Sequence, residues 1–269
     1  MSEIKSKIDL NTKDSHQKGL AWVFEKLLRQ FKTGMQIVCM APLYLLAAAI
    51  LGLALVPGIT LFRWVSDASA NSHFILQNVG YGFSIAVGYF LYGISMVFLI
   101  PLVNSILVGK LKPWRGPYHS FESLKWFVHN GLTYLVRFTF LEFVTPSPLA
   151  LLFYRMMGMK IGKGSIINST WLSDPSLIRM GEKVTIGGSV TIVAHYGQGG
   201  LLVIAPVNIG SGCTIGLKAS IMGGSEIGEN AKILPHSVVL PKTVIPAGET
   251  WGGVPAQKVD IKKFYARAS

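Results

Sequence analysis

The strongest restriction on the fold of this chain is a repeat of six residues in its C-terminal half. Seven aliphatic residues follow one another at intervals of six: Ile209, Ile215, Ile221, Ile227, Ile233, Val239 and Ile245. A small side chain stands four residues after each of the first six, and Glu249 ends the series. Apolar residues of a helix would recur every three or four positions, so a fixed period of six predicts a solenoid of short strands and turns.

A less regular form of the same pattern precedes this series, at Ile161, Ile167, Met180, Ile186 and Ile192. Three hexads make one triangular coil, with the aliphatic side chains inside, the small ones near the corners and glycine easing the tight turns. Each coil covers the strand edges of its neighbours. We therefore expect the C-terminal half to be mainly β, a left-handed parallel β-helix of hexapeptide repeats.

The N-terminal half contains two long apolar runs, residues 37–62 and 79–108. Each exceeds the roughly 20 residues that a helix needs to cross a bilayer. Of the 269 residues, 50% are hydrophobic and 14% are charged, against about 25% charged in ordinary soluble domains. Core helices of soluble domains rarely carry two such runs, and the first is too long and starts too late for a signal peptide. We expect an all-α N-terminal half with two transmembrane helices.

The cationic residues predict how these helices are oriented. The net charge is +12, and lysine and arginine cluster before the first apolar run and after the second, whereas the connection at 63–78 contains only Arg63. The positive-inside rule then places both termini and the β-helix in the cytoplasm, on a multi-pass protein of the inner membrane. The membrane accounts for the positive charge, so no nucleic-acid partner is required.

Two further segments have the pattern of interfacial helices. In residues 18–32, apolar side chains recur at helical spacing with lysine and arginine off that stripe, which is typical of a helix lying among lipid headgroups. Residues 121–144 are rich in aromatics, and a third span is the alternative for them. Because His129 and Arg137 are costly in a bilayer, we expect a helix at the cytoplasmic surface. The expected organisation is a segment 1–36, an anchor 37–109, interfacial helices and linker 110–157, the β-helix domain 158–260 and a tail 261–269.

The hexad pattern is interrupted at one place, and the interruption begins with a histidine. After Ile192 comes a loop that starts at His195 and ends before Pro206, and the repeat resumes at Ile209. A histidine at the end of a rung, a protruding loop and then Pro-x-x-Ile-Gly resemble the hexapeptide-repeat acyltransferases, including the galactoside, maltose and serine acetyltransferases. The resemblance implies that His195 is the general base for an acceptor hydroxyl or amine, because imidazole titrates near working pH. A solvated loop histidine is the alternative, and we expect His236, within a regular hexad, to face outward.

The same resemblance implies a donor site and an acceptor site. In that family a Gly-x-Pro-Ala segment lies along the pantetheine arm of coenzyme A, so an acyl-CoA donor is implied, with acetyl-CoA favoured and no metal. The residues that match or adjoin the donor segment are Trp251, Gly253, Val254, Pro255, Ala256 and Lys258. A plain capping turn is the alternative for this segment. The acceptor-binding residues implied are Asn168, Asp174 and Tyr196, although Asp174-Pro175 is also an ordinary turn.

A second resemblance concerns three segments together: 155–163, the loop at His195, and 248–256. They are similar to the membrane-embedded terminal domains of polylysine-type nonribosomal peptide synthetases, which combine transmembrane helices with hexapeptide-like folds. The printed sequence contains one such unit and neither an adenylation nor a carrier domain. Peptide synthesis by this chain alone is therefore not implied.

The family resemblance also implies a homotrimer, with His195 of one copy facing the coil of the next. The rival hypothesis is a non-catalytic trimeric scaffold that recruits partners to a membrane, although a scaffold has no need of His195. A zinc hydratase on the same fold would need three histidines per site, and the loop after His195 contains no second one. Cys39 and Cys213 lie far apart in apolar sequence and are expected to be buried thiols.

Overall fold

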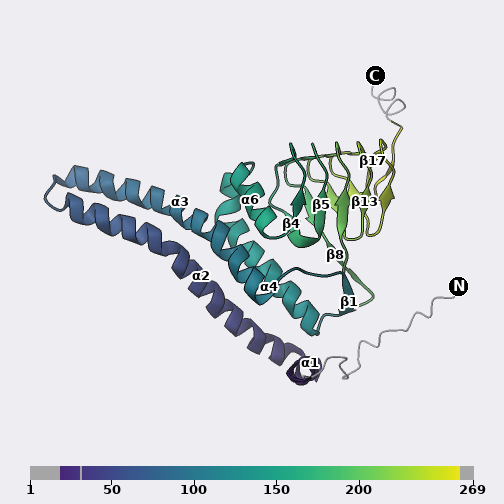
Figure 1. Cartoon of the computed structure of the whole chain (residues 1–269), viewed down its shortest axis with the longest axis horizontal. Helices are drawn as coiled ribbons and strands as arrows, with labels where there is room; N and C mark the ends of the chain where they lie inside the picture. The colour runs from purple at the N-terminus through teal and green to yellow at the C-terminus, as the bar shows by residue number, and fades with distance from the viewer. Residues whose placement is uncertain (1–18, 31, 261–269) are drawn as a thin grey trace.

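The computed structural model describes residues 19–30 and 32–260, and it divides into a helical half and a strand-rich half (Figure 1). The tail expected at 261–269 and most of the segment 1–36 lie outside the described residues. The helices are α1 (Leu20–Gln30), α2 (Lys32–Ser69), α3 (Phe74–Leu107), α4 (Phe121–Val136), the π-helical turn η1 (Arg137–Leu141), α5 (Glu142–Val144) and α6 (Pro148–Met156). They agree with the helical segments expected from the sequence.

Helices α2 and α3 form a long antiparallel hairpin that projects away from the rest of the molecule (Figure 1). Among the described residues, Ala41–Ser69 and Phe74–Leu107 are the two helical stretches long and apolar enough to cross a membrane by length and composition. The helices approach each other closely at two glycines, where a Cβ on Gly58 would lie 3.1 Å from the Cα of Gly88. Large apolar side chains such as Leu53, Phe83 and Ile85 remain exposed on the hairpin, unlike those of the core helices of a soluble domain.

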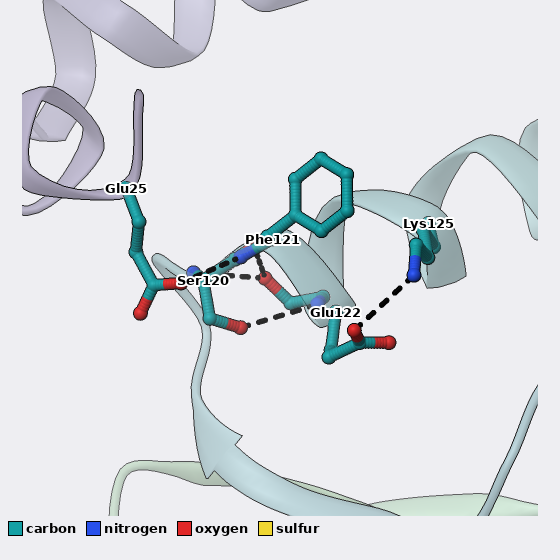
Figure 2. A network of polar contacts seen from close by, with 6 residues as sticks. Glu25, Ser120, Phe121, Glu122 and Lys125 are labelled. Carbon is teal, nitrogen blue, oxygen red and sulfur yellow. Dashed lines mark hydrogen bonds and ion pairs between the residues drawn. The ribbon is translucent and has the colours of Figure 1, made fainter. Parts of the chain in front are cut away.

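Helix α4 begins at a capping box, and the same first turn contacts α1 (Figure 2). Ser120 Oγ accepts from the N–H of Ser123 at 3.1 Å, and Ser123 Oγ accepts from the N–H of Ser120 at 3.2 Å. Figure 2 shows the carboxylate of Glu25, from α1, reaching the N–H of Phe121 in the same first turn. A carboxylate at this end of a helix is favoured by the helix dipole.

The C-terminal half is the parallel β-helix that the repeat predicts. Its three faces are parallel sheets of two- and three-residue strands, apart from β18, which pairs antiparallel at the end. The first face is β16 (Val244–Ile245), β13 (Glu226–Ile227), β10 (Val207–Ile209), β5 (Ile178–Met180) and β2 (Lys160–Ile161). The second is β18 (Gln257–Lys258), β17 (Thr250–Gly252), β14 (Lys232–Ile233), β11 (Thr214–Ile215), β6 (Thr185–Ile186) and β3 (Ile166–Ile167). The third is β15 (Val238–Val239), β12 (Ser220–Ile221), β7 (Thr191–Val193) and β4 (Leu172–Ser173).

The side chains of the repeat fill the prism as expected. All seven aliphatic residues from Ile209 to Ile245 are buried, and so are the small residues from Cys213 to Ser237. The thiol of Cys213 donates to the carbonyl of Gly228, and burial raises the pKa of Cys213. The side chain of Cys39 lies outside the described ones. His236 is exposed at a corner, as expected.

The reason for the repeat's glycines differs from the expected one. Gly216 and Gly228 do not adopt a positive φ, so they are not needed for a left-handed turn. A Cβ on Gly216 would lie 2.5 Å from the backbone N of Pro235, one coil further on. Glycine at this position therefore lets successive coils stack, whereas the left-handed turns are made two residues later by residues such as Lys218 and Asn230.

The insertion at His195 is a β-hairpin and not an irregular loop. Strands β8 (His195–Gln198) and β9 (Leu201–Ile204) pair antiparallel around Gly199 and Gly200, which both have positive φ. Strand β1 (Trp114–Pro117), which precedes α4, adds a third antiparallel strand beside β9. The hairpin thus joins the segment after the anchor to the second coil of the β-helix.

Candidate active site

His195 and Asp174 form a close pair at one corner of the β-helix. Nδ1 of His195 lies 2.6 Å from Oδ2 of Asp174. The pair forms because β4 and β7 are neighbours in one sheet, with Ser173 opposite Val193. Both strands therefore turn the same corner of the prism immediately afterwards. Asp174 is completely buried, and the side chain of His195 is 21% exposed.

A third residue, Asn130, completes this arrangement from the helical half. Its Nδ2 donates to Oδ1 of Asp174 at 2.8 Å. Asn130 lies on α4 and is itself buried. The two oxygens of Asp174 therefore have separate partners, one from the β-helix and one from α4. We call Asn130, Asp174 and His195 the polar triad.

The polar triad leaves one atom of His195 available for proton transfer. A carboxylate accepts hydrogen bonds, so the proton of a neutral His195 lies on Nδ1 and Nε2 has its lone pair free. A carboxylate behind a histidine fixes the ring orientation and the tautomer, and stabilises the imidazolium once a proton has been taken. The ring of Trp126 packs edge-on against the imidazole, with 4.8 Å between ring centroids. This arrangement suits a general base whose position is fixed from two sides.

A second buried polar pair lies beside the polar triad. Nδ1 of His129 lies 2.8 Å from Oδ1 of Asn104, which comes from α3. Because an amide oxygen only accepts, His129 carries its proton on Nδ1. Burial lowers the pKa of His129 to about 4, although the charge of Asp174 acts in the opposite direction. His129 is therefore neutral near pH 7 and links α4 to α3 beside the polar triad.

Arg137 fixes the strand from which Asp174 extends. It is buried, and its Nη2 donates to the carbonyl of Leu172 in β4 at 2.9 Å. Its guanidinium also lies over the rings of Tyr134 and Trp171, with 4.6 Å and 5.3 Å to their centroids. The two costly residues of the segment 121–144, His129 and Arg137, thus contact protein groups and not lipid.

The other two acceptor residues implied by the sequence are not part of the polar triad. Asn168 follows β3, so it is exposed at a different corner of the prism within the same chain. Tyr196 is buried in the hairpin, and its hydroxyl has no hydrogen-bond partner among the described residues. Asp174 is the implied acceptor residue whose side chain pairs with that of His195, and with no exposed surface it lies behind the imidazole.

The segment implied for the donor closes the far end of the β-helix. Trp251 takes the rung position opposite Ile233 in β17, as expected for a residue that replaces an aliphatic one. Val254 is 72% exposed on the turn to β18, Gly253 has a φ of 94°, and Ala256 is buried. Lys258 forms an ion pair with Glu249, and this hydrogen bond lowers the pKa of the glutamate.

The donor segment and His195 are well separated within one chain. His195 leaves the third face after β7, whereas Gly253 leaves the second face after β17, three coils further along the axis. Strands in a sheet are about 4.8 Å apart, so three coils correspond to about 14 Å along the prism. The single chain therefore does not bring the implied base and donor residues into contact.

Trp126 and Asn130 are the site residues that the sequence analysis did not identify. Both belong to the segment 121–144, whose composition indicates a surface helix but not the face that it turns to the β-helix. Their role depends on contacts with residues far along the chain, and 44 positions separate Asn130 from Asp174. An asparagine within an aromatic helix, close to a histidine, is the signal that the segment offers.

Comparisons with known proteins find a curated relative and several similar solved structures. No family model matches the chain. The relative is a delta-poly-L-ornithine synthetase from Acinetobacter baumannii (strain AB307-0294), 23% identical over 170 residues. That match covers 62% of this chain, and the chain spans 12% of the length of the relative.

Several similar solved structures are described as acetyltransferases, some of them with hexapeptide repeats. One from Vibrio cholerae, in complex with acetyl coenzyme A, is 18% identical with a TM-score of 0.41, and the match covers 53% of this chain and 90% of that one. A maltose O-acetyltransferase from Clostridium difficile 630 is 18% identical with a TM-score of 0.41, over 56% and 93%. A serine acetyltransferase from Brucella abortus strain S19 is 19% identical with a TM-score of 0.37, over 87% and 74%. The names agree with the resemblances carried by the sequence motifs.

Proposed function

We propose that this protein is a membrane-anchored acyltransferase that transfers an acyl group from an acyl-CoA to a hydroxyl or amine of a membrane-associated acceptor. The observation that carries the proposal is the polar triad, in which His195 is held by Asp174 and Asp174 by Asn130. A solvated loop histidine would not have a fully buried carboxylate behind it. The rival scaffold hypothesis gives no reason for this arrangement.

In this proposal His195 acts as the general base. Its Nε2 takes the proton of the acceptor hydroxyl or amine as the nucleophile attacks the thioester carbonyl, and the imidazolium that forms is stabilised by Asp174. The tetrahedral intermediate then collapses with departure of the coenzyme A thiolate, and His195 passes the acceptor's proton to the thiolate sulfur. Asp174, assigned by resemblance to acceptor binding, orients the base here because both of its oxygens already have partners.

The donor is proposed to lie along the segment of Gly253, Val254, Pro255 and Ala256, beside Trp251. The exposed turn at Val254 offers backbone for such a contact. Lys258 fits the role of a phosphate contact less well, because Glu249 already neutralises it. Basic side chains at Lys262 and Lys263 lie outside the described residues.

A homotrimer would explain the separation of the two sites. Because His195 and the donor segment leave different corners of one prism, a second copy packed against the third face could present its own donor segment to His195. The same packing would bring Asn168 of a neighbouring copy toward the acceptor. The proposed location is the inner membrane, with α2 and α3 as spans and the β-helix in the cytoplasm.

The test is a thiol-release assay on the protein purified in detergent. A panel of acyl-CoAs is supplied with and without membrane extract, and wild type is compared with His195→Ala. Release that depends on the extract and disappears in the variant supports acyl transfer with His195 as base. Equal background release from both proteins, with no binding of coenzyme A, would overturn the proposal and favour the scaffold.

A further inference from the structure

An apolar groove of about 360 Å³ runs between α2 and α4, next to the polar triad. Its walls are residues 43–47 of α2 and residues 126–135 of α4. None of its lining residues is charged, and most are leucine, aromatic or other apolar residues. A volume of this size lies within the usual range for small-molecule sites, and the lining selects for a hydrocarbon ligand.

The groove and the polar triad share two residues. Trp126 and Asn130 both line the groove, and they are the residues of α4 that contact His195 and Asp174, respectively. A ligand in the groove would therefore lie next to the polar triad, although His195 and Asp174 are not themselves among the lining residues. The indole Nε1 of Trp126 and the Oδ1 of Asn130 are buried without hydrogen-bond partners among the described residues.

The groove also lies at the level where α2 would leave a bilayer. Tyr44 of the groove is 73% exposed, and Trp64 near the other end of α2 is 68% exposed. At 1.5 Å per residue, about 30 Å of helix separates the two, which equals the thickness of the hydrocarbon core. Exposed tyrosine and tryptophan are favoured at both membrane interfaces. By this measure the groove opens at the cytoplasmic interface, within reach of a lipid.

We propose that this groove binds the hydrocarbon chain of a lipid acceptor and places a hydroxyl or amine of its headgroup at Nε2 of His195. This inference rests on the proposed acyl transfer for the role of the headgroup. A lipid acceptor is the favoured occupant because the groove opens at the membrane interface. The donor's acyl chain also has to reach His195 during transfer, and the labelling experiment below distinguishes it from the acceptor.

The chain offers a matched pair of variants for a test. Gly131 lies in the groove, and a Cβ added there meets nothing within 4 Å, so Gly131→Phe fills the groove without a backbone clash. Gly82 of α3 is likewise exposed, with nothing within 4 Å, and lies outside the groove, so Gly82→Phe is the control. Both changes put the same side chain on an apolar helix.

The experiment is photolabelling of the full chain in lipid nanodiscs with palmityl alcohol that carries a diazirine in its chain. Peptides are mapped by mass spectrometry in wild type, both glycine variants and His195→Ala. We expect labelling of α4 in wild type. In Gly131→Phe we expect a loss of at least about fivefold, about 1 kcal/mol, because the phenyl ring occupies space that the hydrocarbon chain needs. Gly82→Phe and His195→Ala should label like wild type.

Failure of this inference can be told from failure of the proposed function, because labelling does not require acyl transfer. Labelling that is absent from α4, or unchanged in Gly131→Phe, overturns the lipid groove even if thiol release depends on His195. Labelling of the groove by a diazirine-bearing palmitoyl-CoA, but not by the alcohol, assigns the groove to the donor and also overturns it. Groove labelling that Gly131→Phe removes, in a protein without acyl transfer, supports the lipid site and removes the enzyme.

Discussion

In the β-helix every rung repeats the same contacts, whereas each helix of the N-terminal half makes contacts of its own. The aliphatic residues from Ile209 to Ile245 are buried at equivalent positions of successive strands. In helix α4, by contrast, Asn130 pairs with Asp174, His129 pairs with Asn104, and Gly131 lines the groove. The repeat therefore supplies a rigid platform, and the candidate site lies where a non-repeating helix contacts it.

The largest effect is expected at that junction, in the tautomer of His195. In Asp174→Asn, an amide can donate its N–H to Nδ1, which shifts the proton of the imidazole to Nε2 and removes the base. By analogy with other carboxylate–histidine pairs, we expect kcat to fall by about 10³–10⁴-fold. Thiol release at saturating acyl-CoA measures the loss, and circular dichroism shows whether the fold is retained. A folded variant with nearly normal kcat would remove Asp174 from the mechanism.

The same glycine-to-alanine substitution should lower the stability in one half and not in the other. Gly216→Ala puts a methyl group 2.5 Å from the backbone N of Pro235, and backbone cannot move aside as a side chain can. We expect a loss of about 1–3 kcal/mol in the free energy of unfolding. Gly82→Ala in α3 meets no atom within 4 Å and should cost nothing, because alanine is the better helix former. Thermal unfolding in one detergent compares them, and equal losses would contradict the stacking role given to Gly216.

The pH dependence of stability should identify the buried helical contact. The pKa of His129 is lowered from 6.5 to about 4 by burial, so the unfolded chain binds this proton more readily than the folded one. The contribution of neutral His129 to the free energy of unfolding is therefore fully present above about pH 6.5. It is lost as the pH drops toward 4, by about 3 kcal/mol in all. In His129→Gln this part of the slope should vanish. An unchanged slope in denaturation midpoints between pH 7 and pH 4 would show that other groups cause it.

The sequence predicts the β-helix well because its information is local and repeated. Seven equally spaced aliphatic residues are enough to give the rungs, and the two apolar runs are enough to give α2 and α3. The hairpin at His195 was also accessible in principle, since Gly199-Gly200 beside the apolar run Leu201–Ile204 is a hairpin signal. Its pairing with β1 was not, because β1 lies far upstream.

The candidate site was predicted only in part. His195 follows from the break in the repeat, but the family resemblance assigns Asp174, together with Asn168 six residues before it, to acceptor binding. A spacing of six puts residues on successive faces of a triangular coil, and it takes a full coil to return to the same corner. The short helix Pro175–Leu177 further shifts the register between β4 and β7. Asn130 could not be assigned because the face of α4 that meets the β-helix depends on three-dimensional packing.

The central claim is that α4, which follows the anchor, helps to hold the proposed base on the β-helix. A double-mutant cycle tests this claim most directly. Thiol release is measured for Asn130→Ala, Asp174→Asn and the double variant, under the conditions of the His195→Ala comparison. If Asn130 acts through Asp174, the double variant is no slower than Asp174→Asn alone, because the interaction has already been removed. A rate reduced by the product of the two single effects would show that Asn130 acts independently and would contradict the account.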